Sequence, residues 1–222
     1  MRQPFLGPLI NDETRRMANA TYLGALHCAG DKTIDFKATW IGFWFHIPGV
    51  TLDPTQVANV LFDEGRDVII SHIDTTEALV VGGQRAASGK NVWVVPYDYK
   101  GACDQAINIC LGVNYFNWGP EYLKAVEKSL NDTFTNEWIW SGPNWDDLNN
   151  PDTSSIGFIH GNGLTNEEST DLNIFIGKLA GGLKLFTGPL NFKDGSVYLA
   201  EGQEASNLGI WYTPQLLAGI GE

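Results

Sequence analysis

Basic residues are scarce in this chain, and their scarcity excludes several classes of partner. The 222 residues include 14 Lys and Arg against 26 Asp and Glu, which gives a formal net charge of −12. A chain with this charge repels phosphate backbones and anionic membrane surfaces, so we expect no nucleic-acid partner. No stretch approaches the roughly 20 apolar residues of a membrane helix, and no signal-like leader stands at the start of the sequence. We therefore expect a chain without a targeting segment of its own.

Cysteine is also scarce. Three cysteines are too few for a disulfide-dense scaffold, and they lack the C-x-x-C pairs of a structural zinc site. Cys103 and Cys110 bracket the short segment GACDQAINIC, which has the composition of a loop. These two could close a small disulfide ring and leave Cys28 over. Alternatively, all three thiols stay reduced, as they would in a cytosolic protein.

Motifs of catalysis and metal binding are missing. The segment GGQRAASGK is no phosphate-binding loop, because Gln84 stands where the motif needs Gly and Asn91 where it needs Ser or Thr. The sequence has no G-x-S-x-G elbow, no H-E-x-x-H pair and no calcium-binding loop. These absences favour a binding protein over an enzyme, and we expect neither a metal site nor a cofactor.

The hydrophobic pattern alternates between short apolar runs and helix-length amphipathic segments. Strand–helix–strand order with short connections predicts an α/β protein with a parallel, helix-covered sheet. In the first half we expect strands at 36–44, 67–73 and 91–97 and helices at 11–30, 53–65 and 75–89. In the second half we expect strands at 111–116 and 137–140, helices at 119–132 and from 165, and a hairpin turning at 193–195.

Aromatic and polar side chains follow the predicted strands where a parallel sheet binds its ligands. Aromatic faces stack on rings, and lone carboxylates and amides bind hydroxyl groups, so this mixture favours a neutral, hydroxyl-bearing ring as ligand. Packing, helix capping and turn formation are the alternative roles of the same residues. The candidates are Trp44 after the first strand, Asp74 and Thr75 after the second, Asp98 after the third, and Asn117 and Trp118 before the fourth helix.

Taken together, these segments resemble a known family. The succession from IGFWFHIPG to NYFNWGPEYLKAV, the tail FTGPLNFKDGSVY and the closing IWYTPQLLAGI are similar to the C-terminal part of the basic membrane protein family. This family of ABC-transporter substrate-binding lipoproteins includes bacterial purine-nucleoside receptors. The resemblance covers about residues 10 to 220 and implies the type I periplasmic-binding-protein fold. That fold has two α/β lobes, doubly wound parallel sheets joined by three crossovers, with the ligand clamped between them.

The resemblance also implies segment boundaries and residue roles. Residues 1–112 would belong to the C-terminal lobe, 113–182 to a crossover segment contributing to the N-terminal lobe, and 183–222 to the return crossover and the C-terminal hairpin. Trp44 resembles the aromatic residue that stacks on the base, although His46 replaces the family's Asp. Asp98 resembles the ribose-binding Asp, and Asn117 or a neighbour stands where the nucleoside receptors place a Lys.

The same resemblance predicts that part of the fold is absent. Met1 would fall just before the first helix of the C-terminal lobe, so that most of the N-terminal lobe and the first strand of the C-terminal lobe would be missing. That strand is central in a doubly wound sheet, and its neighbours would lose backbone partners and expose apolar faces. We therefore expect a truncated chain with half a cleft and weakened ligand binding.

By resemblance, the function is that of a non-catalytic solute-binding component of an ABC importer. It would capture a nucleoside-like or other small hydroxylated solute outside the cytoplasmic membrane, with a permease as its partner and a lipid anchor that this chain lacks. An effector-sensing domain of a transcription regulator shares the fold but normally carries a basic DNA-binding segment, which is missing here. A carbohydrate-active enzyme would use two carboxylates at a fixed separation among aromatic residues.

Overall fold

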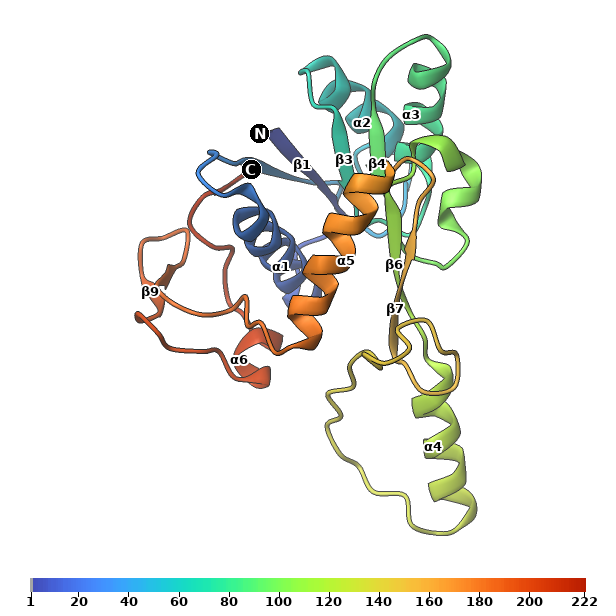
Figure 1. Ribbon diagram of the computed structural model, residues 1–222, viewed down its shortest axis with the longest axis vertical. Coiled ribbons are helices and arrows are strands. Elements are labelled where there is room, and N and C mark those ends of the chain that lie inside the picture. The colour runs from blue at the N-terminus through green and yellow to red at the C-terminus, as the bar shows by residue number, and fades with distance from the viewer. Residues whose placement is uncertain (1) are drawn as a thin grey trace.

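The computed structural model describes residues 2–222, and at its centre lies a five-stranded parallel sheet, here called sheet A (Figure 1). Its strands lie in the order β10-β2-β1-β3-β4, and every neighbouring pair is parallel. The elements of this part are β1 (Arg2–Gly7), α1 (Asp12–Ala29), β2 (Asp35–Trp40), α2 (Pro54–Asp63), β3 (Val68–Ser71), α3 (Glu77–Ala87), β4 (Trp93–Val95) and β10 (Ile220–Gly221). The predicted α/β architecture with a helix-covered parallel sheet is confirmed.

Sheet A separates two hydrophobic cores. Successive side chains of a strand point to opposite faces, so the fully buried Phe5 and Leu6 of β1 enter different cores. Leu6 packs with apolar residues of α2 and α3 on one face. Phe5 packs with α1 and with residues from the C-terminal segment on the other. Both faces are covered, which is the condition for an all-parallel sheet.

The expectation that the first strand is missing is wrong. Residues Arg2–Gly7 form β1, which occupies the centre of sheet A between β2 and β3. Phe5 pairs with Ala38 on one side and with Ile70 on the other, so the neighbouring strands keep their backbone partners. Pro4, Gly7 and Pro8 interrupt the apolar pattern of this run, and such residues normally argue against a central strand.

The helices begin at the residues that their capping patterns indicate. Asn11 accepts a hydrogen bond from the Thr14 backbone N–H at the start of α1, and Asp53 accepts one from the Thr55 N–H before Pro54 of α2. Further along, Thr165 caps α5 (Asn166–Ala180) in the predicted capping box. Within residues 2–222 no helix is both long and apolar enough to cross a membrane.

Beyond sheet A the chain forms a second, smaller sheet. Here β5 (Tyr97–Asp98) pairs in parallel with β6 (Gly112–Phe116), and β6 pairs antiparallel with β7 (Ile156–His160). Two short 3-10 helices, η1 (Ala102–Gln105) and η2 (Ile107–Ile109), precede β6. We call residues 112–182, with β6, α4 (Gly119–Leu130), β7 and α5, the outer unit, and the remainder the central body. Figure 1 shows α4 at the end of the molecule remote from sheet A.

Two predicted strand positions need correction, and one strand was not predicted. The run expected to extend from 36 to 44 forms a strand only as far as Trp40, and Trp44 lies in the following loop. No strand forms at Glu137–Trp140, where the tryptophan side chains contact other indole rings instead of a neighbouring strand. The unpredicted β7 at Ile156–His160 is the partner of β6. The boundaries 1–112, 113–182 and 183–222 stay a prediction.

The C-terminal segment returns to the central body and closes one edge of sheet A. Its β8 (Leu190–Asn191) and β9 (Val197–Leu199) form the predicted hairpin, with Gly195 in a left-handed turn at φ 86°. After α6 (Asn207–Trp211), β10 pairs with β2. The buried Asn19 of α1 holds this segment, because its amide donates to the Gln215 carbonyl and accepts from the Leu217 N–H.

Candidate ligand-binding site

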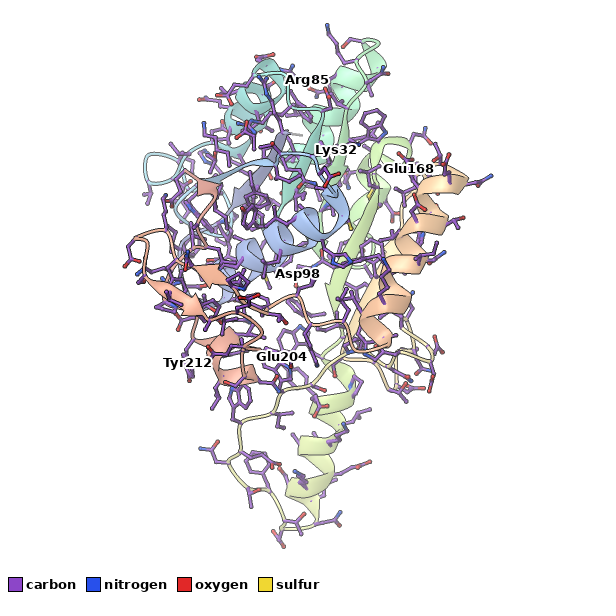
Figure 2. The ribbon with its side chains drawn as sticks, turned by 60° about the vertical axis from the view of Figure 1, so that its left-hand side comes forward. Lys32, Arg85, Asp98, Glu168, Glu204 and Tyr212 are labelled. Carbon is purple, nitrogen blue, oxygen red and sulfur yellow. A yellow bond between two sulfur atoms is a disulfide. The ribbon has the colours of Figure 1, made fainter. Side chains whose placement is uncertain are left out.

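Three carboxylates converge where the strands of the central body end. Asp74 follows β3, Asp98 is the last residue of β5, and Glu13 lies in the first turn of α1, directly after β1. The negative charges of Asp98 and Glu13 both act on the Asp74 carboxyl. Figure 2 shows Asp98 near the centre of the molecule, below α1. Because open parallel sheets bind ligands beyond their carboxyl strand ends, we take this group as the candidate site.

Tyr97 stands between the carboxylates and the core. Its hydroxyl hydrogen-bonds to the Asp74 carboxyl, and burial together with the surrounding negative charges raises the pKa of the Tyr97 hydroxyl far above its usual value. The phenol therefore stays protonated and donates to Asp74. Its ring stacks on His72 with centroids 4.7 Å apart and 10° between the planes, and it meets Phe116 edge-on at 6.2 Å. These contacts fix the position of the hydroxyl.

Both aspartates are held in an environment that disfavours their charge. Burial raises the pKa of Asp74, and the charges of Asp98 and Glu13 raise it further, while the hydrogen bond from Tyr97 opposes them. Burial also raises the pKa of Asp98. Among the described residues, no Lys or Arg forms an ion pair with either aspartate. Such carboxylates are poised to accept hydrogen bonds from a ligand.

The backbone of Asp98 is itself strained. Its φ is 73°, and within residues 2–222 the only other non-glycine residue with positive φ is Asp132 at 55°. The Tyr99 N–H donates to the Tyr97 carbonyl at 2.9 Å, so Asp98 is the central residue of a γ-turn with the disfavoured sign of φ. Strained residues of this kind concentrate where proteins bind ligands. The turn aims the Asp98 side chain in a direction that an extended strand would not allow.

Trp44 and Thr75 lie beside Asp74. The Asp74 N–H donates to the Trp44 carbonyl at 2.8 Å, which ties the loop after β2 to the loop after β3. The half-buried indole of Trp44 meets the Phe43 ring edge-on at 5.3 Å. Thr75 Oγ1 is buried and has no hydrogen-bond partner among the residues that the structure describes. The structure thus brings four predicted residues together: Trp44, Asp74, Thr75 and Asp98.

Asn117 and Trp118 have local contacts in the outer unit. The Asn117 amide donates to the carbonyls of Pro151 and Ser154, each at 2.7 Å, and so holds the segment that leads into β7. The exposed Trp118 packs between Phe116 and Tyr122, at 5.6 and 6.1 Å. Their link to the carboxylates runs through Phe116, which contacts Tyr97. A ligand role for these two residues stays a prediction.

The Sγ atoms of Cys103 and Cys110 are bonded, and Cys28 is free and exposed. The bond encloses η1 and η2 and lies between Asp98 and β6. Cys110 is fully buried and forms a bridge to Val94 of β4. The disulfide therefore anchors the segment after the γ-turn to the edge of sheet A.

Sequence reasoning did not single out Glu13, Tyr97 or His72. Tyr97 and His72 lie near the ends of the predicted strands at 91–97 and 67–73, but their sequence context indicates core residues. Burial lowers the pKa of His72 to about 3, and its Nδ1 lies 3.3 Å from Met17 Sδ, so the ring stays neutral and serves as a stacking surface for Tyr97. Glu13 becomes a strand-end residue only once β1 is recognised. Recognising β1 before α1 in the sequence would have predicted that Glu13 lies at the strand ends.

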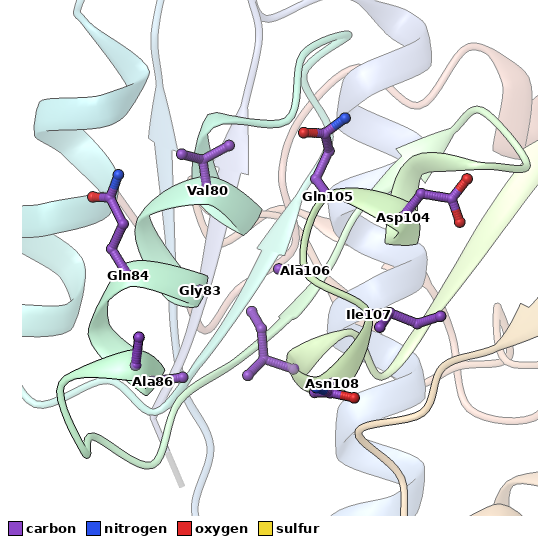
Figure 3. A pocket seen from close by; sticks show the side chains of 11 residues that line it. Val80, Gly83, Gln84, Ala86, Asp104, Gln105, Ala106, Ile107 and Asn108 are labelled. Carbon is purple, nitrogen blue, oxygen red and sulfur yellow. The ribbon is translucent and has the colours of Figure 1, made fainter.

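Two hollows of the surface lie away from the carboxylates. The larger, about 900 Å³, is a groove between α3 and the disulfide-closed segment; Figure 3 shows Val80 and Gln84 on one wall and Gln105 and Ile107 on the other. The smaller, about 240 Å³, lies between β2 and α2. Neither includes Asp74 or Asp98.

Comparison with known proteins finds a similar curated protein and a similar solved structure. No family model matches it. It is 26% identical over 226 residues to a purine-binding protein of Brucella abortus, a match that covers 97% of this chain and 56% of that protein. Its fold is similar to that of an ABC-transporter solute-binding protein from Conexibacter woesei, with a TM-score of 0.54, 14% identity, and coverage of 82% of this chain and 55% of that one.

These likenesses agree with the resemblance read from the sequence. The parallel sheet A and the structural match confirm a periplasmic-binding-protein-like α/β fold. The chain spans only slightly more than half the length of each protein that it matches. What those proteins bind is therefore carried to this chain only as a proposal.

Proposed function

We propose that this chain is the ligand-binding part of a non-catalytic solute-binding protein of an ABC importer, and that its solute is a purine or purine nucleoside. The convergence of Asp74 and Asp98 at the strand ends carries the proposal, because both carboxylates are partly desolvated without a cationic partner. A neutral ligand with hydroxyl or amino donors would satisfy them, whereas a phosphate group would be repelled. The likeness to a purine-binding protein supports the same class of solute.

The roles of the site residues follow from their positions. Asp98, presented by the γ-turn, would accept hydrogen bonds from ribose hydroxyls, and Asp74, oriented by the Tyr97 hydroxyl, would accept from a second donor of the ligand. Trp44 would provide an apolar face beside Asp74. Thr75 Oγ1, buried without a partner among residues 2–222, would contribute one more polar contact.

The proposed setting is extracytoplasmic, with a transporter permease as partner and attachment to the membrane through a lipid anchor. The disulfide between Cys103 and Cys110 supports an oxidising compartment, because such bonds persist in the periplasm and at cell surfaces and are rare in the cytosol. Neither of the two described hollows includes the carboxylates, so we expect this chain alone to bind its solute weakly.

A thermal-shift screen tests the proposed function. A solute that binds only the folded state raises the melting temperature, and the rise grows with the logarithm of the solute concentration above the dissociation constant. We expect adenine and adenosine to raise it at millimolar concentration, adenosine monophosphate to have a smaller effect, and the Asp74→Asn/Asp98→Asn double variant not to respond. If purines leave the melting temperature of the folded wild-type chain unchanged while another solute class raises it, the proposed ligand is wrong.

A further inference from the structure

The helix α4 presents a row of large apolar side chains that stay exposed. Tyr122, Val126 and Leu130 follow one another at intervals of four residues, and Leu123 lies three residues before Val126. Side chains at these spacings share one face of a helix. Trp118, directly before the helix, extends the row because its ring stacks on Tyr122 with centroids 6.1 Å apart. We call these five residues the α4 stripe.

The α4 stripe is large for the surface of a monomer. Its five side chains are between 54% and 79% exposed. At roughly 150–200 Å² for a large apolar side chain, these fractions leave about 500 Å² of apolar surface in contact with water. Contiguous apolar patches of more than a few hundred Å² are rare on monomeric proteins and mark interaction sites. The size of the α4 stripe therefore indicates a binding surface for another protein.

The surroundings of the α4 stripe favour a second copy of this chain as its occupant. The stripe contains no charged residue, and the lysines of α4 already form ion pairs, Lys124 with Glu121 at 2.9 Å and Lys128 with Glu137. An identical stripe can therefore cover it without burying an unpaired charge. Figure 1 shows α4 at the end of the molecule remote from sheet A, so two copies can meet through α4 while their central bodies stay apart.

We propose that this chain forms a symmetric dimer through the α4 stripes of two copies. Two stripes together would bury about 1,000 Å², the size at which specific protein–protein interfaces begin. Because this area is at the lower limit, we expect a dissociation constant of about 10–100 μM and a monomer at low micromolar concentration. The inference does not depend on the proposed function, since the contact involves no solute.

Sedimentation velocity over a concentration series tests the dimer. We expect the wild type to change from a monomer at about 5 μM to mostly dimer at about 500 μM. Leu123→Glu places a carboxylate in the stripe of both copies and should weaken association more than about tenfold. Ile174→Glu is the matched control on α5, where Ile174 is 55% exposed, and should associate like the wild type. A wild type that stays monomeric at about 500 μM would overturn the proposal.

The salt dependence of association separates an apolar contact from an ionic one. Each copy carries a formal net charge of −12, so association brings like charges together. Raising NaCl from about 50 mM to about 500 mM screens this repulsion and should tighten the dimer. A dimer that dissociates as salt rises would be held by ion pairs, which contradicts the proposal.

Cysteine cross-linking tests whether the two stripes face each other. A symmetric contact brings the same patch of both copies together, so Val126, near the middle of the α4 stripe, should lie close to Val126 of the second copy. In a Cys28→Ser background, which removes the free thiol, Val126→Cys should form a disulfide between copies when oxidised with diamide. Lys124→Cys lies two residues away on the opposite side of α4 and should stay uncross-linked.

Two other outcomes would assign the contact elsewhere. If Leu123→Glu associates like the wild type, α4 takes no part in the dimer and the proposal fails. If instead Val126→Cys does not cross-link and Val80→Glu abolishes association, the α4 stripe of one copy lies in the groove between α3 and the disulfide-closed segment of the next. That head-to-tail arrangement would overturn the symmetric dimer.

Discussion

The central body and the outer unit differ in how they treat their apolar side chains. In the central body, Phe5 and Leu6 of β1 have no exposed surface, and the two cores enclose residues from every helix around sheet A. In the outer unit, α5 has no buried residue and α4 buries only Pro120. The large apolar residues along α4 are all more than half exposed; they are Tyr122, Leu123, Val126 and Leu130.

This difference separates the part that holds the fold from a part that is packed more loosely against it. The buried sheet fixes the strand ends, and only a rigid scaffold can keep Asp98 in a strained turn and Asp74 beside another carboxylate. Phe175 against His27 and Trp138 against Trp211 are among the contacts that hold the outer unit to that scaffold. We therefore expect stability to depend mainly on the central body.

The largest contrast in the free energy of unfolding is expected between substitutions at two leucines, one in each region. Leu6→Ala removes a fully buried side chain from the core between β1 and the helices α2 and α3, and should lower the free energy of unfolding by about 2–5 kcal/mol. Leu123→Ala, on the exposed face of α4 where Leu123 is 61% exposed, should change it by less than about 0.5 kcal/mol. Urea denaturation measures both. Equal losses would mean that the outer unit is packed as tightly as the central body.

The disulfide at the junction of the two regions should have the next largest effect. Cys103 and Cys110 are seven residues apart, and closing a loop of this length stabilises a fold by roughly 2–3 kcal/mol through the entropy of the unfolded chain. Cys103→Ala/Cys110→Ala should lose that amount in urea denaturation, while Cys28→Ala, at the free and exposed cysteine, serves as the control and should lose little. A double variant as stable as the control would contradict a stabilising role of the bond.

The smallest effect, and the most specific, is expected at the carboxylates. Because burial and repulsion raise the pKa of Asp74, its protonated form is favoured by folding; its contribution to stability is present below the unfolded pKa and is lost as pH rises through the folded pKa. Asp74→Asn should therefore stabilise the chain at pH 7, by about 0.5 kcal/mol after allowance for solvent screening. The gain should vanish near pH 3.

On acidification, ligand affinity should fall, whereas the contribution of Asp74 to stability rises. Acidification from pH 7 towards pH 4 protonates Asp74 and Asp98 and removes two acceptors, so adenosine should bind more weakly as the chain loses this repulsion. Elsewhere in the chain, carboxylates with a lowered pKa, such as Asp194 with a pKa of about 2, stabilise the fold at neutral pH. Their contribution to stability is lost on acidification. The difference between wild type and Asp74→Asn, measured from pH 3 to 7, isolates the site. A pH-independent difference would contradict the electrostatic account.

Local signals in the sequence predicted the helices of the fold better than its strands. Asn11, Asp53 and Thr165 mark helix starts by hydrogen bonds within one turn, which the sequence records directly. Strands depend on partners far away in the chain. Pro4 interrupts the apolar pattern of β1, so this strand was not predicted. Glu137–Trp140 was predicted to be a strand, but no partner strand lies beside it in the described structure.

The candidate site shows the same division. Asp74 and Asp98 follow apolar runs, so the strand-end rule was sufficient to predict that they meet. Glu13 required knowledge of β1, and the stacking of Tyr97 on His72 required the register of separate strands. The positive φ of Asp98 is a property of the folded turn and leaves no pattern in the sequence. Sequence reasoning therefore predicted that the two aspartates lie near each other but missed the residues that position them.

The most direct test of the account is a calorimetric titration of adenosine into the wild type, Asp98→Asn and Asp132→Asn. The two aspartates are the non-glycine residues with positive φ in the described chain, and only Asp98 lies at the strand ends, so the same substitution at Asp132 controls for the turn. We predict that Asp98→Asn weakens binding about 10- to 100-fold, as loss of a charged acceptor implies, and that Asp132→Asn binds like the wild type. Equal affinity of all three proteins would contradict the central claim that the strand-end carboxylates bind the solute.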